Sequence, residues 1–120
     1  MIEKMKGLPA HVLGFTAKGK VTAEDYEKVL IPAVEKELKE NKKVRFLYHF
    51  GEDFEGFEAG AMWEDTKVGL AHFSSWERIA IVTDIEWLRV MMKVFGFVMP
   101  GVVRIFGNSE IAEAKRWIAE

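Results

Sequence analysis

The residue types that most often carry catalytic or metal chemistry are sparse in this sequence. Its 120 residues include three histidines, His11, His49 and His72, and no cysteine. None of the histidines has a second ligand at the spacing of a metal site, and without cysteine neither a thiolate zinc site nor a thiol nucleophile can form. His49 is the best candidate for a functional histidine, because it lies near the carboxyl end of an expected strand, ahead of Glu52 and Asp53.

The acidic residues and the glycines form no catalytic motif either. Glu64 and Asp65 are adjacent on one expected helix and therefore point about 100° apart, which argues against a carboxylate pair that shares a proton. We expect Asp65 to pair with Lys67, Lys93 or Arg78 instead. The glycines after position 50 lack the spacing of a dinucleotide fingerprint or of a phosphate-binding loop. We therefore expect a protein that is not an enzyme and holds neither a cofactor nor a metal.

Charge and hydropathy limit the partners and the location. A formal net charge of −2 gives no general attraction for a phosphate backbone, and the basic residues between positions 39 and 45 are interpreted as a solvated helix end. We therefore expect no nucleic acid partner. The first six residues lack the features of a secretory signal, and no window holds 18 uncharged apolar residues. We expect a cytoplasmic protein, with peripheral contact to a membrane left open.

The apolar pattern predicts an α/β domain that spans residues 1–120, with the element order ββαβαβαβα. Alternating strands and helices are typical of a mixed, mostly parallel sheet that is flanked by helices. The predicted strands are 12–19, 44–50, 78–83 and 102–106, with residues 1–6 as an antiparallel edge, and the strand 44–50 is expected to end abruptly in a loop at 52–56. The predicted helices are 23–39, 57–73, 85–99 and a final helix through 118.

Polar residues and one proline set the expected ends and bends of the helices. Thr22 is predicted to be the N-cap of the first helix and Asp84 that of the third. Pro32 lies inside the first helix, where it removes a backbone donor and clashes one turn back. We expect a kink near Leu30.

Two segments indicate where the core lies. The strand 78–83 is apolar after its first residue, which is typical of a central strand covered on both faces. The second helix carries apolar residues at helical spacing, which predicts a stripe that faces the core. The members of that predicted stripe are Ala59, Met62, Trp63, Leu70 and Phe73.

The helix 85–99 has more apolar surface than a sheet can cover. At about 100° per residue its polar residues and its glycine share an arc of roughly 80°, which leaves roughly 240° apolar. The surplus can be covered by the rest of the domain, a second copy of the chain, a hydrophobic ligand or a membrane surface. Its methionines and aromatics are typical of an adaptable contact surface, while Arg89 and Lys93 can extend toward lipid headgroups.

The segment 57–73, followed by 78–84 and Trp87, resembles the SpoIIAA-like family, as does 21–26 ahead of 31–33. The resemblance covers nearly the whole chain. It implies a STAS-like fold, related in shape to the lipid-binding CRAL-TRIO (Sec14-like) domains, and a binding role that involves a hydrophobic pocket and membrane association. Anti-anti-sigma factors of the STAS class carry a phosphorylated serine in the loop before the second helix. Here that loop, 51–57, contains no hydroxyl residue.

The leading hypothesis is a binding domain for an apolar or lipid-like small ligand, with reversible membrane association through the helix 85–99. The alternative is a protein-interaction module that resembles anti-anti-sigma factors, or a homodimer formed through the same helix. The candidate ligand-binding or membrane-binding residues are Trp63, Trp87, Met91, Phe95, Phe97 and Val98.

Overall fold

A five-stranded mixed sheet forms the centre of the computed structural model, which describes the backbone of all 120 residues and every side chain except those of Leu70 and Phe73. The strands lie side by side in chain order: β1 (Ile2–Lys4), β2 (Val12–Val21), β3 (Val44–Phe57), β4 (Trp76–Thr83) and β5 (Val102–Phe106). β1 pairs antiparallel with β2, and all later pairs are parallel. The predicted α/β class and the antiparallel N-terminal edge are confirmed.

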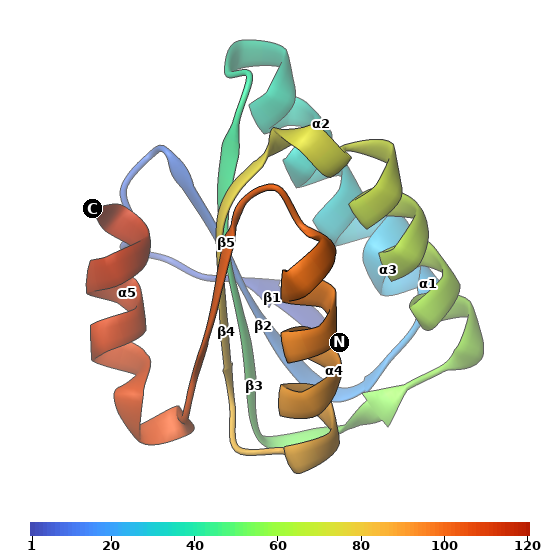
Figure 1. The fold of residues 1–120 in the computed structure, drawn as a ribbon. Helices are drawn as coiled ribbons and strands as arrows, with labels where there is room; N and C mark the ends of the chain where they lie inside the picture. The colour runs from blue at the N-terminus through green and yellow to red at the C-terminus, as the bar shows by residue number, and fades with distance from the viewer.

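The helices form two unequal layers (Figure 1). One face of the sheet carries α1 (Ala23–Asp25), the π-helical turn η1 (Tyr26–Leu30), α2 (Ile31–Glu40), α3 (Ala59–Ala71) and α4 (Glu86–Val98). The other face is covered by α5 (Ile111–Ala119), which follows the short helix η3 (Asn108–Glu110). A short helix η2 (Phe73–Ser75) joins α3 to β4. Each layer encloses its own cluster of buried apolar side chains, and the larger cluster lies under α1 to α4.

The first helix bends through a π-helical turn at the predicted place. Thr22 is its N-cap and accepts a hydrogen bond from the backbone N–H of Asp25, as predicted. A regular helix would pair the carbonyl of Lys28 with the N–H of residue 32, but Pro32 has none. The chain accommodates this with the wider turn Tyr26–Leu30, in which the N–H of Ile31 bonds to the carbonyl of Tyr26.

Strand β3 is longer than predicted, and the loop expected at 52–56 is wrong. The strand continues through Gly51, because β2 is also long and still pairs with it where Gly19 lies opposite Phe54. Phe54 is buried, with its ring centroid 4.9 Å from that of Phe50. Gly56 takes a φ of 136°, which L side chains rarely adopt, so it completes the strand where another residue would be strained. The burial of Phe54 therefore favours an extended strand at 52–56, where the acidic residues had indicated a loop.

The core-facing stripe predicted for α3 is wrong for three of its members. Ala59, Met62 and Trp63 are exposed, and Trp63 is 63% exposed. The side chains of Leu70 and Phe73 lie outside the part that the structure describes. The second helix begins at Ala59, two residues later than predicted.

The buried face of α3 contains small and acidic residues. Ala61, Glu64 and Val68 are buried, at a spacing of three and four residues. Asp65, next to Glu64, accepts a hydrogen bond from the Tyr26 hydroxyl at 2.7 Å. The rotational position of this helix is therefore fixed by a polar contact to η1, which hydrophobic periodicity cannot reveal.

Asp84 does not cap α4, contrary to the prediction. The N-cap of α4 is Ile85, whose backbone N–H bonds to the hydroxyl of Thr83 at 3.1 Å. Asp84 instead accepts a hydrogen bond from the backbone N–H of Asn108 at 2.9 Å. It therefore ties the carboxyl end of β4 to the start of η3, a contact between residues 24 positions apart in the sequence.

Candidate functional site

Helix α4 exposes a continuous apolar face that we call the α4 stripe. It consists of Trp87, Val90, Val94, Phe97 and Val98, all of them exposed. At about 100° per residue these five positions fall within an arc of roughly 100°. Phe97 is 90% exposed, so it makes almost no contact with the rest of the chain. Such a set of large apolar side chains on one helix face is a feature of an interaction surface.

The opposite side of α4 anchors the helix to the sheet. Leu88 and Met92 are buried in the larger core, and Met99 just beyond the helix is buried with them. Because these residues already cover the sheet, the helix has no further core to which the stripe could turn. The exposure of the stripe is thus a direct result of an almost wholly apolar sequence on a helix that one sheet can cover on one side only.

The structure brings only part of the predicted set of binding residues to the surface. Trp87, Phe97 and Val98 lie in the α4 stripe, and Trp63 is exposed on α3. Met91 and Phe95 are partly buried and pack against the core. Sequence reasoning missed two members of the stripe, Val90 and Val94. Their spacing of three and seven residues from Trp87 was the available signal, but the aromatic residues and methionines were favoured over them.

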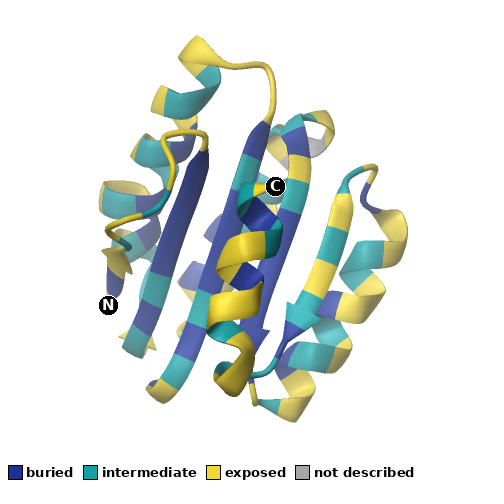
Figure 2. Cartoon of the chain, turned by 90° about the vertical axis from the view of Figure 1, so that its left-hand side faces the viewer, coloured by how far each residue is buried: buried dark blue, intermediate teal, exposed yellow. Residues whose placement is uncertain are grey.

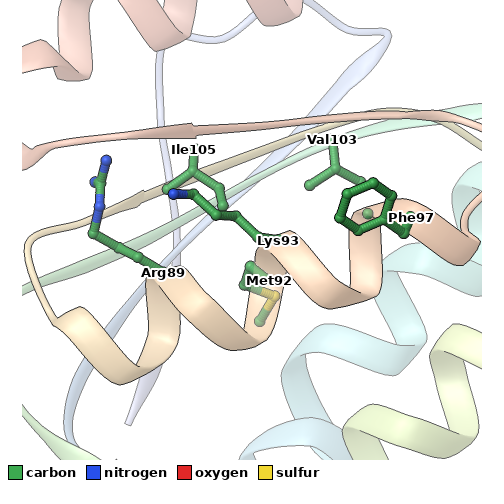
Figure 3. Close-up of a pocket in the computed structure, with 7 residues that line it drawn as sticks. Arg89, Met92, Lys93, Phe97, Val103 and Ile105 are labelled. Carbon is green, nitrogen blue, oxygen red and sulfur yellow. The ribbon is translucent and has the colours of Figure 1, made fainter.

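An open groove lies beside the stripe, between α4 and β5, and we call it the α4–β5 groove (Figure 3). Its volume is about 420 Å³. The apolar part of its lining comes from Met92, Phe97, Val103 and Ile105, while Arg89 and Lys93 extend across it toward β5. The polar arc of α4 therefore lies between the stripe and the sheet edge, so that cationic groups border the apolar surface on one side.

A second open groove of about 370 Å³ separates the first helix from α3. Its lining is mixed in charge, with Glu27, Glu35 and Glu64 together with Lys67 and His72. Lys67 pairs with Glu64 at 3.3 Å. Ile31, Val68 and Ala71 complete its lining, so the apolar part of this groove is bordered by charged groups of both signs.

The expected ion pair of Asp65 with a lysine or arginine is wrong. Its carboxylate accepts the hydroxyl hydrogen of Tyr26, and the Tyr26 hydroxyl also lies 3.0 Å from that of Tyr48. Burial raises the pKa of Asp65 above its ordinary value, although the hydrogen bond from Tyr26 acts in the opposite direction. Burial also raises the pKa of both tyrosines. The three side chains join α3, η1 and β3, and we assign them a structural role.

His49, the histidine favoured by the sequence, lies on β3 and is partly buried. Burial lowers its pKa, an effect that Asn108 and Asp53 oppose. Within the part of the chain that the structure describes, no three or more histidine, aspartate or glutamate side chains gather as they would around a metal ion.

Membrane crossing can be tested against helix length and hydropathy. Among the residues that the structure describes, no helix combines the length and the apolar character that a bilayer span requires.

Comparisons with other proteins agree with this architecture. The family model described as SpoIIAA-like matches residues 12–119. A crystal structure of an uncharacterized protein from the DUF3478 family with a SpoIIAA-like fold, from Shewanella loihica PV-4, is 28% identical in sequence. The match covers 98% of this chain and 92% of that chain, with a TM-score of 0.78. No curated protein matches this chain. The chain belongs to the SpoIIAA-like family.

Proposed function

We propose that this chain is a non-catalytic binding domain that docks reversibly on a membrane surface through the α4 stripe. The observation that carries the proposal is the shared exposure of five apolar side chains on one helix face. Both grooves are open, which favours contact with a lipid layer over the enclosure of a single small molecule. The apolar, lipid-like ligand expected from the sequence is then the acyl region of a membrane.

The apolar stripe can supply binding energy of the size that reversible docking needs. Full burial of a Val or Phe side chain contributes about 1.5 to 3 kcal/mol, so half-burial of five such side chains contributes roughly 4 to 7 kcal/mol. A single myristoyl chain, with an association constant of about 10⁴ M⁻¹, anchors a protein only marginally. The stripe falls in the same range, and the resulting contact is expected to be reversible.

The charges near the stripe favour an anionic surface only slightly. Lys93 is exposed, and its long side chain can reach the headgroup layer while the apolar face enters the interface. Arg89 is partly engaged, because it donates to the carbonyl oxygen of Thr83 at 2.8 Å. Since the whole chain carries a net charge of −2, apolar contact and not electrostatic attraction is the main source of affinity.

The proposal is tested by flotation of the purified protein with vesicles of phosphatidylcholine, with and without phosphatidylglycerol. Phe97→Glu places a charge at the most exposed position of the stripe without disturbing the core. The matched control is Val102→Glu. Val102 is also an exposed apolar residue, but it lies on the side of β5 that faces away from the α4–β5 groove.

Wild type and Val102→Glu are expected to float with the vesicles, more strongly when phosphatidylglycerol is present, while Phe97→Glu stays in the soluble fraction. Absence of wild-type protein from both kinds of vesicle would overturn the proposal. If a second copy of the chain covers the stripe instead, sedimentation velocity would detect a wild-type dimer. That dimer would dissociate in Phe97→Glu.

A further inference from the structure

The outer edge of β5 is a second unpartnered surface, separate from the α4 stripe except that Phe97 borders both. β5 is the last strand of the sheet and pairs with β4 alone among the strands that the structure describes. Figure 2 shows this strand at the edge of the sheet, with α4 alongside it and no further strand of the described chain beyond it. An edge strand presents a row of backbone N–H and C=O groups that can pair with another extended chain.

The side chains of β5 point alternately to two different surroundings. Val103 and Ile105 line the α4–β5 groove. Arg104 points to the other face, where its guanidinium lies 4.8 Å from the ring centroid of Phe106 and 5.2 Å from that of Trp117. An added strand would therefore meet an apolar groove on one face. On the other face it would meet the guanidinium of Arg104, which is held in place by two aromatic rings.

Positive charge lies on both faces of this edge. Arg89 and Lys93 extend over the α4–β5 groove, and Arg104 stands on the opposite face. Of the side chains that the structure describes, no carboxylate lies within 4.0 Å of these three cations. The edge is thus complementary to an extended segment that carries acidic side chains, although the chain as a whole is acidic.

The same charges disfavour a second copy of the chain at this edge. Antiparallel pairing of the whole of β5 with its copy about a twofold axis would place Arg104 directly opposite the Arg104 of that copy. Like charges that face each other across a strand pair are destabilising, and charged residues on edge strands commonly prevent self-association. An acidic partner strand meets no such repulsion.

We propose that the outer edge of β5, together with the α4–β5 groove, binds an extended acidic peptide of a protein partner as a sixth strand. Backbone hydrogen bonds to the edge supply affinity, and the alternating surroundings of β5 supply specificity. Apolar side chains of the peptide enter the α4–β5 groove, which has room for them at about 420 Å³. Acidic side chains at the alternate positions face Arg104. This inference does not rest on the membrane-docking function.

The test uses two fluorescein-labelled seven-residue peptides and the full chain without lipid. One peptide alternates glutamate with valine and the other alternates lysine with valine. Fluorescence anisotropy measures affinity, and amide hydrogen exchange of the nitrogen-15-labelled protein locates the contact. The variants Arg104→Glu and Lys93→Glu reverse the charge on either face of the edge, and Lys39→Glu makes the same change at an exposed position at the end of α2.

The glutamate peptide is expected to bind saturably and at least tenfold more tightly than the lysine peptide, and to protect every other amide of β5. Each edge variant is expected to weaken it at least tenfold, while Lys39→Glu leaves the affinity unchanged. Equal affinity for the two peptides, no saturable binding of the glutamate peptide, unchanged exchange in β5 or an equal loss in Lys39→Glu would each overturn the proposal. Protection of β5 that grows with protein concentration alone would assign the edge to a second copy instead.

Discussion

Tyr26 donates its hydroxyl hydrogen to the carboxylate of Asp65 at 2.7 Å, across the contact between η1 and α3. The Tyr26 hydroxyl is also 3.0 Å from the Tyr48 hydroxyl on β3, so one group links two elements of the main helical layer to the sheet. Both tyrosines are buried. A buried hydrogen-bonded chain of this kind fixes the position of α3 more sharply than apolar packing alone, because the groups lose their water on burial and need one another.

Replacement of Asp65 with asparagine is predicted to change how stability depends on pH. Burial holds the folded-state pKa of Asp65 above its ordinary value of 3.8, so the native state binds this proton more tightly than the unfolded chain does. The contribution of Asp65 to the free energy of unfolding is therefore fully present below about pH 3.8 and is lost as pH rises through the folded-state pKa. The asparagine side chain would still offer an amide oxygen to Tyr26 but would not ionise.

The stability of Asp65→Asn relative to wild type is thus expected to improve as the pH is raised from 3.5 to roughly 7, the range in which a carboxyl group with a raised pKa loses its proton. Denaturant unfolding of both proteins at each pH measures the difference. Because every other titrating group is shared, the subtraction isolates residue 65. A relative stability that falls with rising pH would contradict the raised pKa.

Removal of the Tyr26 hydroxyl is predicted to cost more than removal of the Tyr48 hydroxyl. Tyr26→Phe leaves the Asp65 carboxylate without its tyrosine donor, a loss of about 1 to 3 kcal/mol for a buried group. Tyr48→Phe removes only a contact between two hydroxyl groups, and Tyr26 keeps its bond to Asp65, so about 1 kcal/mol is expected. Urea unfolding of the two variants checks the order, and equal losses would mean that the bond to Asp65 adds nothing.

The contrast between α3 and β4 explains how much of the fold was predictable. β4 is buried on both faces, and its apolar run from Ile79 to Val82 marked it correctly as a central strand. In α3 the inward residues include Asp65, whose partner Tyr26 lies on another element, while Trp63 faces outward. A pattern rule assigns large apolar residues to the core, and it fails where a tertiary hydrogen bond sets the rotation of a helix.

The sequence indicated which helix carries the candidate site, but not which side chains of that helix are exposed. The excess of apolar residues between 85 and 99 indicated α4, and Phe97 and Val98 were identified as contact residues. The split of this helix into a buried side with Met92 and an exposed side with Val94 depends on where the sheet lies beneath it. Arg104 entered no predicted site, because its place at the sheet edge follows from strand order, which a single sequence does not encode locally.

Two glycines are predicted to respond in opposite ways to alanine. A Cβ at Gly101 would collide with the backbone carbonyl oxygen of Trp76, which is part of the sheet and cannot move aside cheaply. Among the side chains that the structure describes, a Cβ at Gly69 in α3 would meet the ring of Phe95 alone, at 3.9 Å, an ordinary contact. Gly69→Ala is therefore expected to raise the free energy of unfolding by about 0.5 to 1 kcal/mol.

Gly101→Ala is expected to lower the free energy of unfolding by about 1 to 3 kcal/mol, the usual range for an overpacked site. Thermal unfolding of both variants beside wild type measures the two shifts. The position of the turn between α4 and β5 would be wrong if Gly101→Ala unfolded at the wild-type temperature, since the collision is with backbone and not with a flexible side chain.

Two substitutions on α4 separate its anchoring side from the α4 stripe. Leu88 is fully buried, so Leu88→Ala is predicted to lower the free energy of unfolding by about 2 to 5 kcal/mol through lost transfer energy and a cavity. Phe97 is 90% exposed, and Phe97→Ser is predicted to change stability by less than about 0.5 kcal/mol in the isolated protein. Guanidinium unfolding without lipid or peptide measures both values. A large loss in Phe97→Ser that grew with protein concentration would mean that a second copy of the chain already covers the stripe, because dissociation is then part of unfolding.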